Sequence, residues 1–344
     1  MAQEIKVGLV GFGLGGQAFH APYVTATPGM TLSAVVSSDS AKVHRRYPDV
    51  IVVPTIEALL GLPDIDLVVV SSPDAFHAEH ALAAICKGRH VVVDKPFAAT
   101  LAEAERVGRA ADQAGTMLTI FHNRRWDADF LTLRRIMGEG LLGDIVQFES
   151  HFDRWRPTAS TLWKDARAGG VWFDLGPHLV DQALCLFGMP EAVYVDIAAF
   201  RPDAPAPDYF HAILHYPGRR AILHAGKQVA DHRLRFAVHG TAGSWIKQGV
   251  DPQEAAALAG GAPNSAGWGS DPLSGTFTAA GQPDIARNIA NERGDYGRFW
   301  KDVAAAIRGE GRNPVPHGEA INVMRILDAG LTSAKTGRRV TLEH

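Results

Sequence analysis

The fold is decided by residues 5–16, which read Ile5-Lys6-Val7-Gly8-Leu9-Val10-Gly11-Phe12-Gly13-Leu14-Gly15-Gly16. The first six form a short apolar run typical of a buried strand, and a stretch with helical periodicity follows the glycines. Gly11, Gly13 and Gly16 match the pattern G-x-G-x-x-G. Between a strand and a helix this pattern predicts a dinucleotide site, with the pyrophosphate on N–H groups at the helix start. A flexible glycine turn is the alternative.

Each glycine of this loop has an expected purpose. Gly11 allows the tight turn, Gly13 lets the backbone approach a pyrophosphate, and Gly16 permits close packing of the helix. We expect Phe12 and Leu14, which lie between them, to border the same ligand.

Five more apolar runs alternate with helical segments in the first third of the chain. They are residues 32–36, 51–53, 67–70, 91–93 and 117–120. Runs without polar alternation are typical of parallel strands buried on both faces. Thr100-Leu101-Ala102-Glu103 fits a capping box, and Gly115 is placed to end that helix. We therefore predict an α/β fold whose residues 1–122 form a Rossmann domain, a doubly wound parallel sheet that binds a dinucleotide.

After about residue 122 the pattern becomes that of an α+β domain. Residues 208–216 and 220–225 alternate with period two around Pro217-Gly218 and predict a hairpin. We expect residues 123–344 to form a domain for substrate binding and oligomerisation, with a large, mostly antiparallel open sheet. Helices would cover one face, and the other would be free for a second subunit of a homodimer or homotetramer. Residues 251–283, rich in Gly, Ala and Pro, predict a long loop.

Composition excludes several classes of protein. The 344 residues carry 34 Lys and Arg and 37 Asp and Glu, so the net charge is 34 − 37 = −3, which argues against nucleic acid as a partner. With 46% hydrophobic residues, the chain is not disordered. No apolar run approaches the ~18 residues of a membrane helix. Cys86 and Cys185 form no disulfide framework. The first strand begins at Ile5 and leaves no room for a signal peptide, so we expect a cytoplasmic protein.

The end of the second strand bears on the choice between NAD and NADP. An NAD site places Asp or Glu there to bind the ribose 2′-hydroxyl. This chain has Ser37 and Ser38 instead, followed by Arg45 and Arg46, with Asp39 between. A carboxylate ~4 Å from a 2′-phosphate would cost about 4 kcal/mol per unit charge. We therefore favour NADP, with NAD as the alternative.

Two further motifs predict a reaction centre. Lys95 lies two residues past the strand at 91–93, at the sheet edge where ligands bind, and Pro96 keeps its backbone extended. Asp174 and His178 are four residues apart. If Asp174 opens a helix, Pro177 falls in the first turn and both side chains project from one helix end. The alternatives are an exposed lysine, a simple N-cap aspartate and a packed histidine.

With these motifs the chain resembles the Gfo/Idh/MocA oxidoreductases over essentially its whole length. The resemblance rests on residues 11–16, 72–77, 88–96 and 174–178. The family has Glu before the Lys-Pro pair, where this chain has Asp94. Other segments resemble the NADP-dependent scyllo-inositol dehydrogenases of the family. These are residues 122–127, 154–157, 174–178 and 268–269.

The resemblance implies that Lys95, Asp174 and His178 are the catalytic triad. His178 would act as acid or base, Lys95 would polarise the substrate oxygen, and Asp174 would hold substrate hydroxyls; the roles of Lys95 and His178 are interchangeable. Five more residues would border the cofactor. They are Ser72, Pro73, His77, Asp94 and Asn123.

Aromatic and basic residues of the second domain are candidates for substrate binding. Trp155, Trp163 and Trp172 would give apolar walls to a sugar-like ring, with Arg154 and Arg156 as donors at its rim. Core aromatics and surface charges are the alternative roles.

We expect no metal site. His211 and His215 lie ~13 Å apart on a strand and cannot share an ion. The sequence thus predicts an NADP-dependent dehydrogenase that acts on a ring polyol or sugar, such as scyllo-inositol, with scyllo-inosose as substrate in reverse. The alternatives are a reductase of an anhydro-sugar, deoxy-sugar ketone or dihydrodiol, and a cofactor-sensing regulator without activity.

Overall fold

The structure, a computed structural model, describes residues 4–159 and 169–342. The chain forms two compact units, each made of three segments. Unit 1 comprises the residues up to 123 together with 253–268 and 295–324. Unit 2 comprises 124–252, 269–294 and the residues from 325 onward. The division into sequential domains 1–122 and 123–344 stays a prediction.

Unit 1 contains a six-stranded parallel sheet. Its strands are β1 (Ile5–Val10), β2 (Met30–Val36), β3 (Ile51–Val53), β4 (Leu67–Val70), β5 (His90–Val93) and β6 (Leu118–Ile120). The order β3-β2-β1-β4-β5-β6 reverses direction between β1 and β4, so the predicted doubly wound sheet is confirmed. Ile51 is 51% exposed because β3 is an edge strand, whereas we expected both faces of these strands to be buried.

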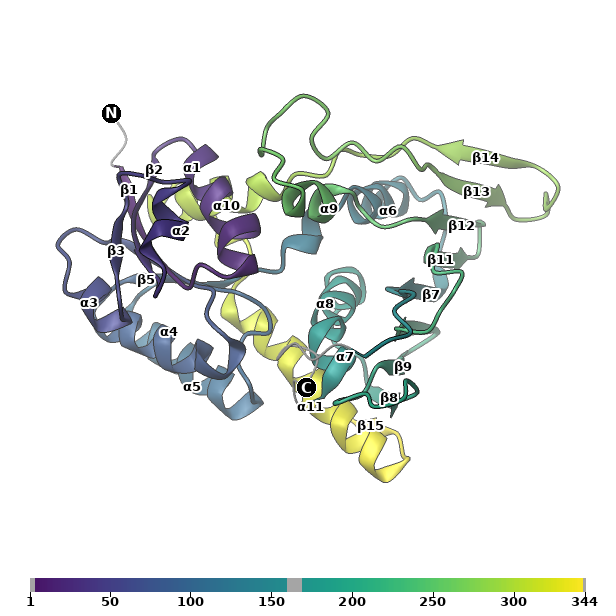
Figure 1. The fold of residues 1–344 in the computed structure, drawn as a ribbon. Helices are drawn as coiled ribbons and strands as arrows, with labels where there is room; N and C mark the ends of the chain where they lie inside the picture. The colour runs from purple at the N-terminus through teal and green to yellow at the C-terminus, as the bar shows by residue number, and fades with distance from the viewer. Residues whose placement is uncertain (1–3, 160–168, 343–344) are drawn as a thin grey trace. The chain divides into compact units, whose positions relative to one another are not determined.

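Unit 1 also contains helices, most of which surround this sheet (Figure 1). They are η1 (Gly16–His20), α1 (Ala21–Ala26), α2 (Ser40–His44), α3 (Ile56–Leu60), η2 (Asp74–Phe76), α4 (His77–Cys86), α5 (Leu101–Ala114), α9 (Gln253–Leu258), α10 (Tyr296–Ile307) and the first part of α11 (His317–Thr336). The predicted capping box opens α5. Thr100 Oγ1 accepts the N–H of Glu103 at 3.2 Å, and the Glu103 carboxylate accepts that of Thr100 at 3.1 Å. Gly115 ends α5 with φ 64°.

Unit 2 contains a nine-stranded sheet. Its strands are β7 (Ile145–His151), β8 (Ala192–Ala198), β9 (Tyr209–Tyr216), β10 (Arg219–Gly226), β11 (Leu234–Gly240), β12 (Gly243–Gln248), β13 (Gly275–Ala279), β14 (Ala286–Ile289) and β15 (Val340–Thr341). The order is β14-β13-β12-β11-β7-β10-β9-β8-β15, and β7 and β10 are its parallel pair. The predicted hairpin is β9 and β10, with Leu214 opposite Ala221.

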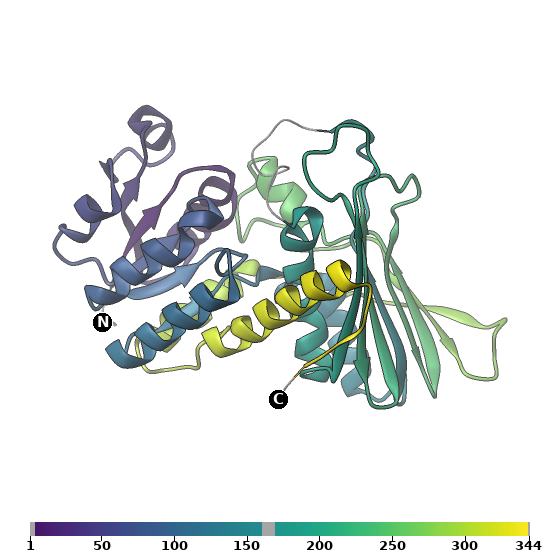
Figure 2. The same ribbon diagram turned by 90° about the horizontal axis from the view of Figure 1, so that it is seen from below.

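The helices of unit 2 lie against one face of this sheet (Figure 2). They are η3 (Asn123–Trp126), which begins at the boundary of the units, α6 (Ala128–Gly138), α7 (Gly170–Asp174), α8 (Gly176–Phe187) and the last part of α11. Along β9 buried residues alternate with half-buried ones, as in a sheet whose second face is open. The prediction of a mostly antiparallel open sheet is confirmed.

The prediction of a long loop over residues 251–283 is wrong. This segment contains helix α9 and strand β13. Gln253-Glu254-Ala255-Ala256-Ala257-Leu258 consists of good helix formers, and counting its alanines together with nearby Gly and Pro hid that signal. Strand β13 is held by pairing with β12, a long-range contact that composition does not reveal.

Among the described residues, no helix has the length and apolar character that crossing a lipid bilayer requires.

Candidate active site

The glycine loop of unit 1 has the shape of a dinucleotide cradle. Gly11 has φ +99°, and a Cβ there would lie 2.6 Å from the carbonyl oxygen of Ser71. A Cβ on Gly16 would lie 2.3 Å from the carbonyl oxygen of Gly11, so the helix packs closely on the turn. A Cβ on Gly13 would meet nothing within 4 Å. The open space over Gly13, next to the helix start, fits a pyrophosphate group.

Several strands of unit 1 end beside this loop. The Gly11 N–H donates to the carbonyl of Val36 at the end of β2, at 3.2 Å. The Ser71 N–H, just past β4, donates to Val10 at the end of β1, at 2.9 Å. The loop therefore lies at the carboxyl edge of the sheet, at its topological switch point, where ligands of such sheets bind.

The end of β2 shows how Asp39 is used. Its carboxylate accepts the N–H of Lys42 at 2.9 Å and so caps helix α2. Its own N–H donates to Ser37 Oγ at 3.1 Å. The carboxylate is thus turned to the helix amides, and Ser37 and the exposed Ser38 are the first polar side chains after the strand.

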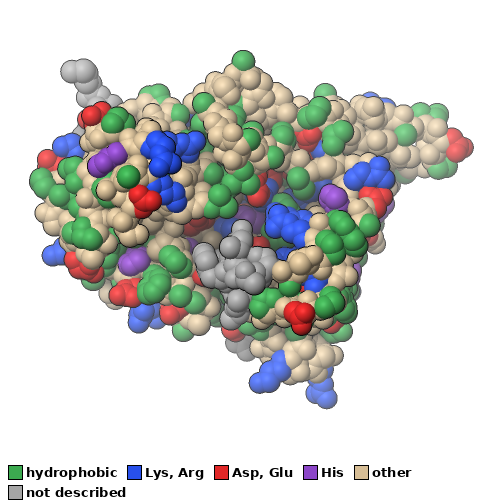
Figure 3. Space-filling view, viewed as in Figure 1, with side chains coloured by type: hydrophobic (Ala, Val, Ile, Leu, Met, Phe, Trp, Pro, Cys, Tyr) green, Lys and Arg blue, Asp and Glu red, His purple; other side chains and the backbone are tan. Residues whose placement is uncertain are grey.

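Basic side chains follow on α2 and just after it. Arg45 and Arg46 are both exposed. Arg46 Nη1 donates to the carbonyl of Gln17 in the helix that the glycine loop opens, at 3.3 Å. Figure 3 shows Lys and Arg side chains gathered on the part of unit 1 that carries α1 and α2. We predicted that Arg45 borders the cofactor, and the structure adds Arg46, which is hydrogen-bonded to the helix that the glycine loop opens.

Lys95 leaves the sheet at the end of β5, where it is half-buried. The residue before it, Asp94, binds three groups of the same edge. Its Oδ1 accepts the N–H of Lys95 at 2.8 Å, and its Oδ2 accepts the His20 Nε2–H at 3.0 Å and the Ser71 hydroxyl at 3.3 Å. A Cβ on Gly15 would lie 2.9 Å from Asp94 Oδ2. Asp94 therefore fixes the turn that carries Lys95 against the glycine helix.

These contacts keep Asp94 ionised. Burial raises the pKa of the Asp94 carboxyl, but the neighbouring His20, through its charge and its hydrogen bond, and then His77 and Lys95 outweigh burial. The pKa falls from 3.8 to about 2. Asp94 is consequently an acceptor at neutral pH and holds the N–H groups around it.

His20 is a residue of this edge that sequence reasoning missed. Its side chain is fully buried, 4.6 Å from the ring of Phe121 and 5.7 Å from that of Trp300, measured between ring centroids. It lies one turn after Gly16 in a stretch that pattern analysis treats as an apolar helix. Its partner Asp94 is far away in sequence, so no local signal joins the two.

The remaining candidates of unit 1 lie around the loop after β4. His77 is buried, with Nδ1 2.8 Å from the carbonyl oxygen of Pro96 and Nε2 2.9 Å from that of Ser72. Burial lowers the pKa of His77, so the neutral ring donates to one of these carbonyls. The Ser72 hydroxyl lies 2.9 Å from His80 Nδ1, and Pro73 precedes η2. His77 thus joins this loop to the Lys-Pro turn.

In unit 2 the prediction that Asp174 opens a helix is wrong. Asp174 is the last residue of α7, and α8 begins at Gly176, with Leu175 between them. A Cβ on Gly176 would lie 2.9 Å from the Trp172 ring, so this glycine lets the second helix start close against the first. Pro177 does fall in the first turn of α8. Asp174 and His178 therefore belong to two successive helices, and His178 is buried.

A buried polar network holds α8 in place. Arg125 makes a bidentate pair with Asp181, with Nε–Oδ2 2.9 Å and Nη2–Oδ1 2.6 Å. Gln182 donates to the carbonyl of Arg124 at 2.9 Å and accepts from Arg235 at 2.7 Å. These contacts fix the helix one turn beyond His178. They also give a structural role to Arg124 and Arg125, the arginines that follow Asn123. Asn123 is itself buried at the start of η3.

Trp172 has the core role that was its alternative. Its ring is fully buried and lies edge-on against Phe210, at 4.9 Å between centroids. Its indole N–H donates to the carbonyl of Leu327 at 3.0 Å. Trp172 has no exposed surface to offer a substrate ring, so we no longer count it among the candidate substrate-binding residues.

The other substrate candidates lie beyond the end of β7. Trp155 is 52% exposed, and Arg156 is also exposed. The Arg154 guanidinium lies 5.2 Å from the centre of the Phe152 ring. Trp163 lies outside the described residues.

Comparison with known proteins places this geometry in a family. Residues 5–122 match the oxidoreductase family model of the NAD-binding Rossmann fold, and residues 134–342 match that of the C-terminal alpha/beta domain of the same family. The uncharacterized oxidoreductase YdgJ of Escherichia coli is 44% identical, over 99% of each chain. The scyllo-inositol 2-dehydrogenase (NADP+) IolW of Bacillus subtilis is 40% identical, over 99% of this chain and 96% of that protein.

A solved structure from Yersinia pestis agrees at the level of the fold. It is 45% identical, covers all of this chain and 99% of that one, and superimposes with a TM-score of 0.96. Together with the glycine cradle at the switch point of a parallel sheet, these matches identify the chain as a member of the Gfo/Idh/MocA family of oxidoreductases.

Proposed function

We propose that this oxidoreductase is an NADP-dependent dehydrogenase that oxidises a ring CH–OH group of a polyol or sugar, with scyllo-inositol as the first candidate and scyllo-inosose as substrate in reverse. The observation that carries the proposal is the meeting of the glycine cradle with the Asp94-Lys95 turn at one sheet edge. The similarity to IolW over nearly the whole chain supports the choice of substrate.

Each candidate residue has a separate role in the proposed transfer of a hydride and a proton from the substrate. The bound nicotinamide supplies a carbon that accepts the hydride. Gly11, Gly13 and Gly16 hold the pyrophosphate, and the Lys95 ammonium polarises the oxygen that loses its proton. His178 takes that proton, and Asp174 orients neighbouring hydroxyls.

The preference for NADP follows from the end of β2. Asp39 Oδ1 accepts the Lys42 N–H and caps α2, so this carboxylate is turned toward the helix amides rather than held for a ribose 2′-hydroxyl as in an NAD site. Ser37 and Ser38 supply hydroxyl donors instead. Arg46, in contact with the glycine helix, supplies a cation for a 2′-phosphate.

The test is absorbance at 340 nm with NADP or NAD across a panel of ring polyols, sugars, anhydro-sugars and dihydrodiols. Turnover of an inositol, with NADP preferred at least tenfold in kcat/KM, is the expected result. Turnover of other ring alcohols or ketones alone would overturn the proposed substrate. Cofactor binding without turnover of any compound would point to a sensing role and overturn the proposed reaction.

A further inference from the structure

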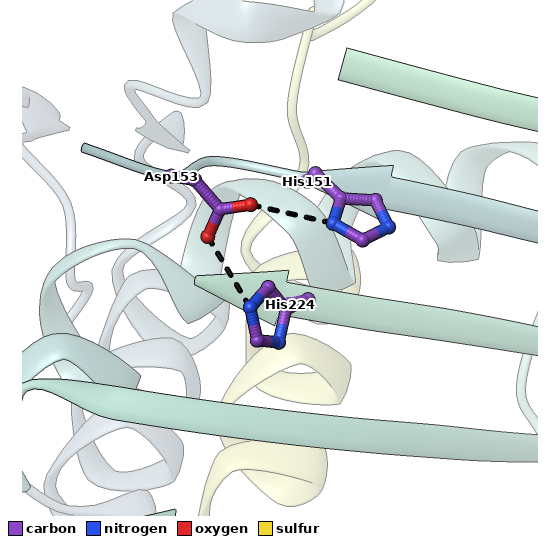
Figure 4. Close-up of side chains that lie close together, drawn as sticks. All are labelled: His151, Asp153 and His224. Carbon is purple, nitrogen blue, oxygen red and sulfur yellow. Dashed lines mark ion pairs between the residues drawn. The ribbon is translucent and has the colours of Figure 1, made fainter. Parts of the chain in front are cut away.

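Three side chains of unit 2 converge on the open face of the nine-stranded sheet (Figure 4). His151 ends β7, Asp153 lies two residues further on, and His224 lies on β10 directly opposite His151. Asp153 Oδ2 is 3.4 Å from His151 Nδ1, and Asp153 Oδ1 is 3.3 Å from His224 Nε2. We propose that these side chains bind a divalent transition-metal ion, for which Zn²⁺ is the best fit.

The spacing of the three donors suits a small ion. One ligand atom from each residue lies within 4.8 Å of the others. Zinc bonds of about 2.0–2.1 Å in a tetrahedron place neighbouring ligand atoms about 3.3 Å apart. The two nitrogen–oxygen separations, 3.4 Å from His151 to Oδ2 and 3.3 Å from His224 to Oδ1 of the same carboxylate, are close to this length. Rotation of the side chains would bring both nitrogens and one carboxylate oxygen around a single ion.

The surroundings orient the donors toward one point. Glu149 Oε2 lies 3.1 Å from His151 Nε2, and the N–H of Gly226 donates to Asp153 Oδ1 at 2.8 Å. Because His151 Nε2 is engaged by Glu149, Nδ1 is the ring nitrogen that faces the Asp153 carboxylate. A carboxylate behind a ligating imidazole is the usual outer shell of such metal sites.

The donor set selects the kind of metal. Two imidazoles and one carboxylate suit Zn²⁺ and its neighbours Co²⁺ and Ni²⁺, whereas Ca²⁺ and Mg²⁺ prefer oxygen ligands alone. The His151, Asp153 and His224 side chains are 15%, 6% and 16% exposed, so the cluster lies at a partly exposed position on the sheet. His211, on β9 opposite His224, borders this position, with the two ring centroids 5.6 Å apart.

Our expectation of no metal site considered histidines on one strand and missed this cluster. The ligands come from β7 and β10, which are parallel neighbours in the sheet but distant in the sequence. The site is therefore a property of strand register, which spacing along the chain does not show.

The test uses the untagged full-length protein, stripped with a chelator and titrated with Co²⁺ and then Zn²⁺. The expected result is one equivalent bound, with the visible absorption of tetrahedral Co²⁺ that Zn²⁺ displaces. His151→Gln and His224→Gln should each raise Kd at least tenfold. The matched control is His215→Gln, on the same face of β9 but ~13 Å along the strand from His211, and it should leave Kd unchanged.

Either of two results would overturn the proposal. One is wild-type binding no tighter than that of the His151→Gln His224→Gln double variant. The other is an equal loss of metal affinity in His215→Gln, which would mean that the metal binds to histidines scattered over the surface. Because the substituted residues lie in unit 2, urea unfolding of each variant checks that it is folded. If the variants do not fold, anomalous scattering at the zinc edge from wild-type crystals decides: a peak among His151, Asp153 and His224 supports the site, and its absence at saturating Zn²⁺ refutes it.

Discussion

Replacing Asp94 by Asn tests how the lysine turn is fixed to the glycine helix. In the wild type the Asp94 carboxylate accepts from His20 at 3.0 Å and from the Lys95 N–H at 2.8 Å, and its pKa is about 2 rather than 3.8. Because the folded-state pKa lies below the unfolded-state value, the carboxylate stabilises the protein above pH 3.8. This contribution is lost as the pH falls toward 2.

The size of the effect follows from the two pKa values. The difference 3.8 − 2 = 1.8, at about 1.4 kcal/mol per unit, gives about 2.5 kcal/mol of unfolding free energy at neutral pH. The Asp94 side chain is 21% exposed, so solvent screening makes this an upper figure. By linkage, about 1 kcal/mol of it is lost between pH 6 and pH 3.

The assay is urea unfolding at several pH values between 6 and 3. The stability advantage of the wild type over Asp94→Asn should shrink by about 1 kcal/mol over this range. In His20→Ala, the main group that lowers the pKa of Asp94 is gone and burial remains, so the pH dependence should flatten. Parallel curves for the wild type and Asp94→Asn would refute the reasoning.

Three further predictions concern catalysis, cofactor choice and stability. Lys95→Ala and His178→Ala should each lower kcat at least about 100-fold with NADPH affinity retained, as stopped-flow and fluorescence titration would show; near-normal turnover in either contradicts the assignment. Arg46→Ala should raise KM for NADP about tenfold and leave KM for NAD unchanged, and an equal effect on both would argue against a 2′-phosphate contact. Asp181→Asn removes the carboxylate charge that pairs with the largely buried Arg125 and should cost about 3–5 kcal/mol in denaturant unfolding, whereas a loss below 1 kcal/mol would show that the pair does not hold α8.

Local signals in the sequence predicted much of the fold. The glycine loop, the capping box at Thr100 and the period-two alternation of the β9–β10 hairpin each depend on residues close together in the chain. The break between α7 and α8 escaped prediction because it depends on Gly176 packing against Trp172.

The same distinction applies to the site. Strand ends and glycines pointed to the edge where Gly11 and Lys95 lie, because parallel strands bring their carboxyl ends together. His20 was missed because its role depends on Asp94, a contact formed only by the folded sheet. The cluster of His151 and His224 was missed for the same physical reason, since register across β7 and β10 creates it.

A crystal structure of the protein with NADP and scyllo-inositol would show whether Lys95 and His178 act on the same substrate hydroxyl. We expect a ring carbon about 3.5 Å from C4 of the nicotinamide, with Lys95 Nζ and a ring nitrogen of His178 both within about 3 Å of the hydroxyl on that carbon. A polyol bound at hydride distance with either nitrogen turned to another part of the molecule would contradict it.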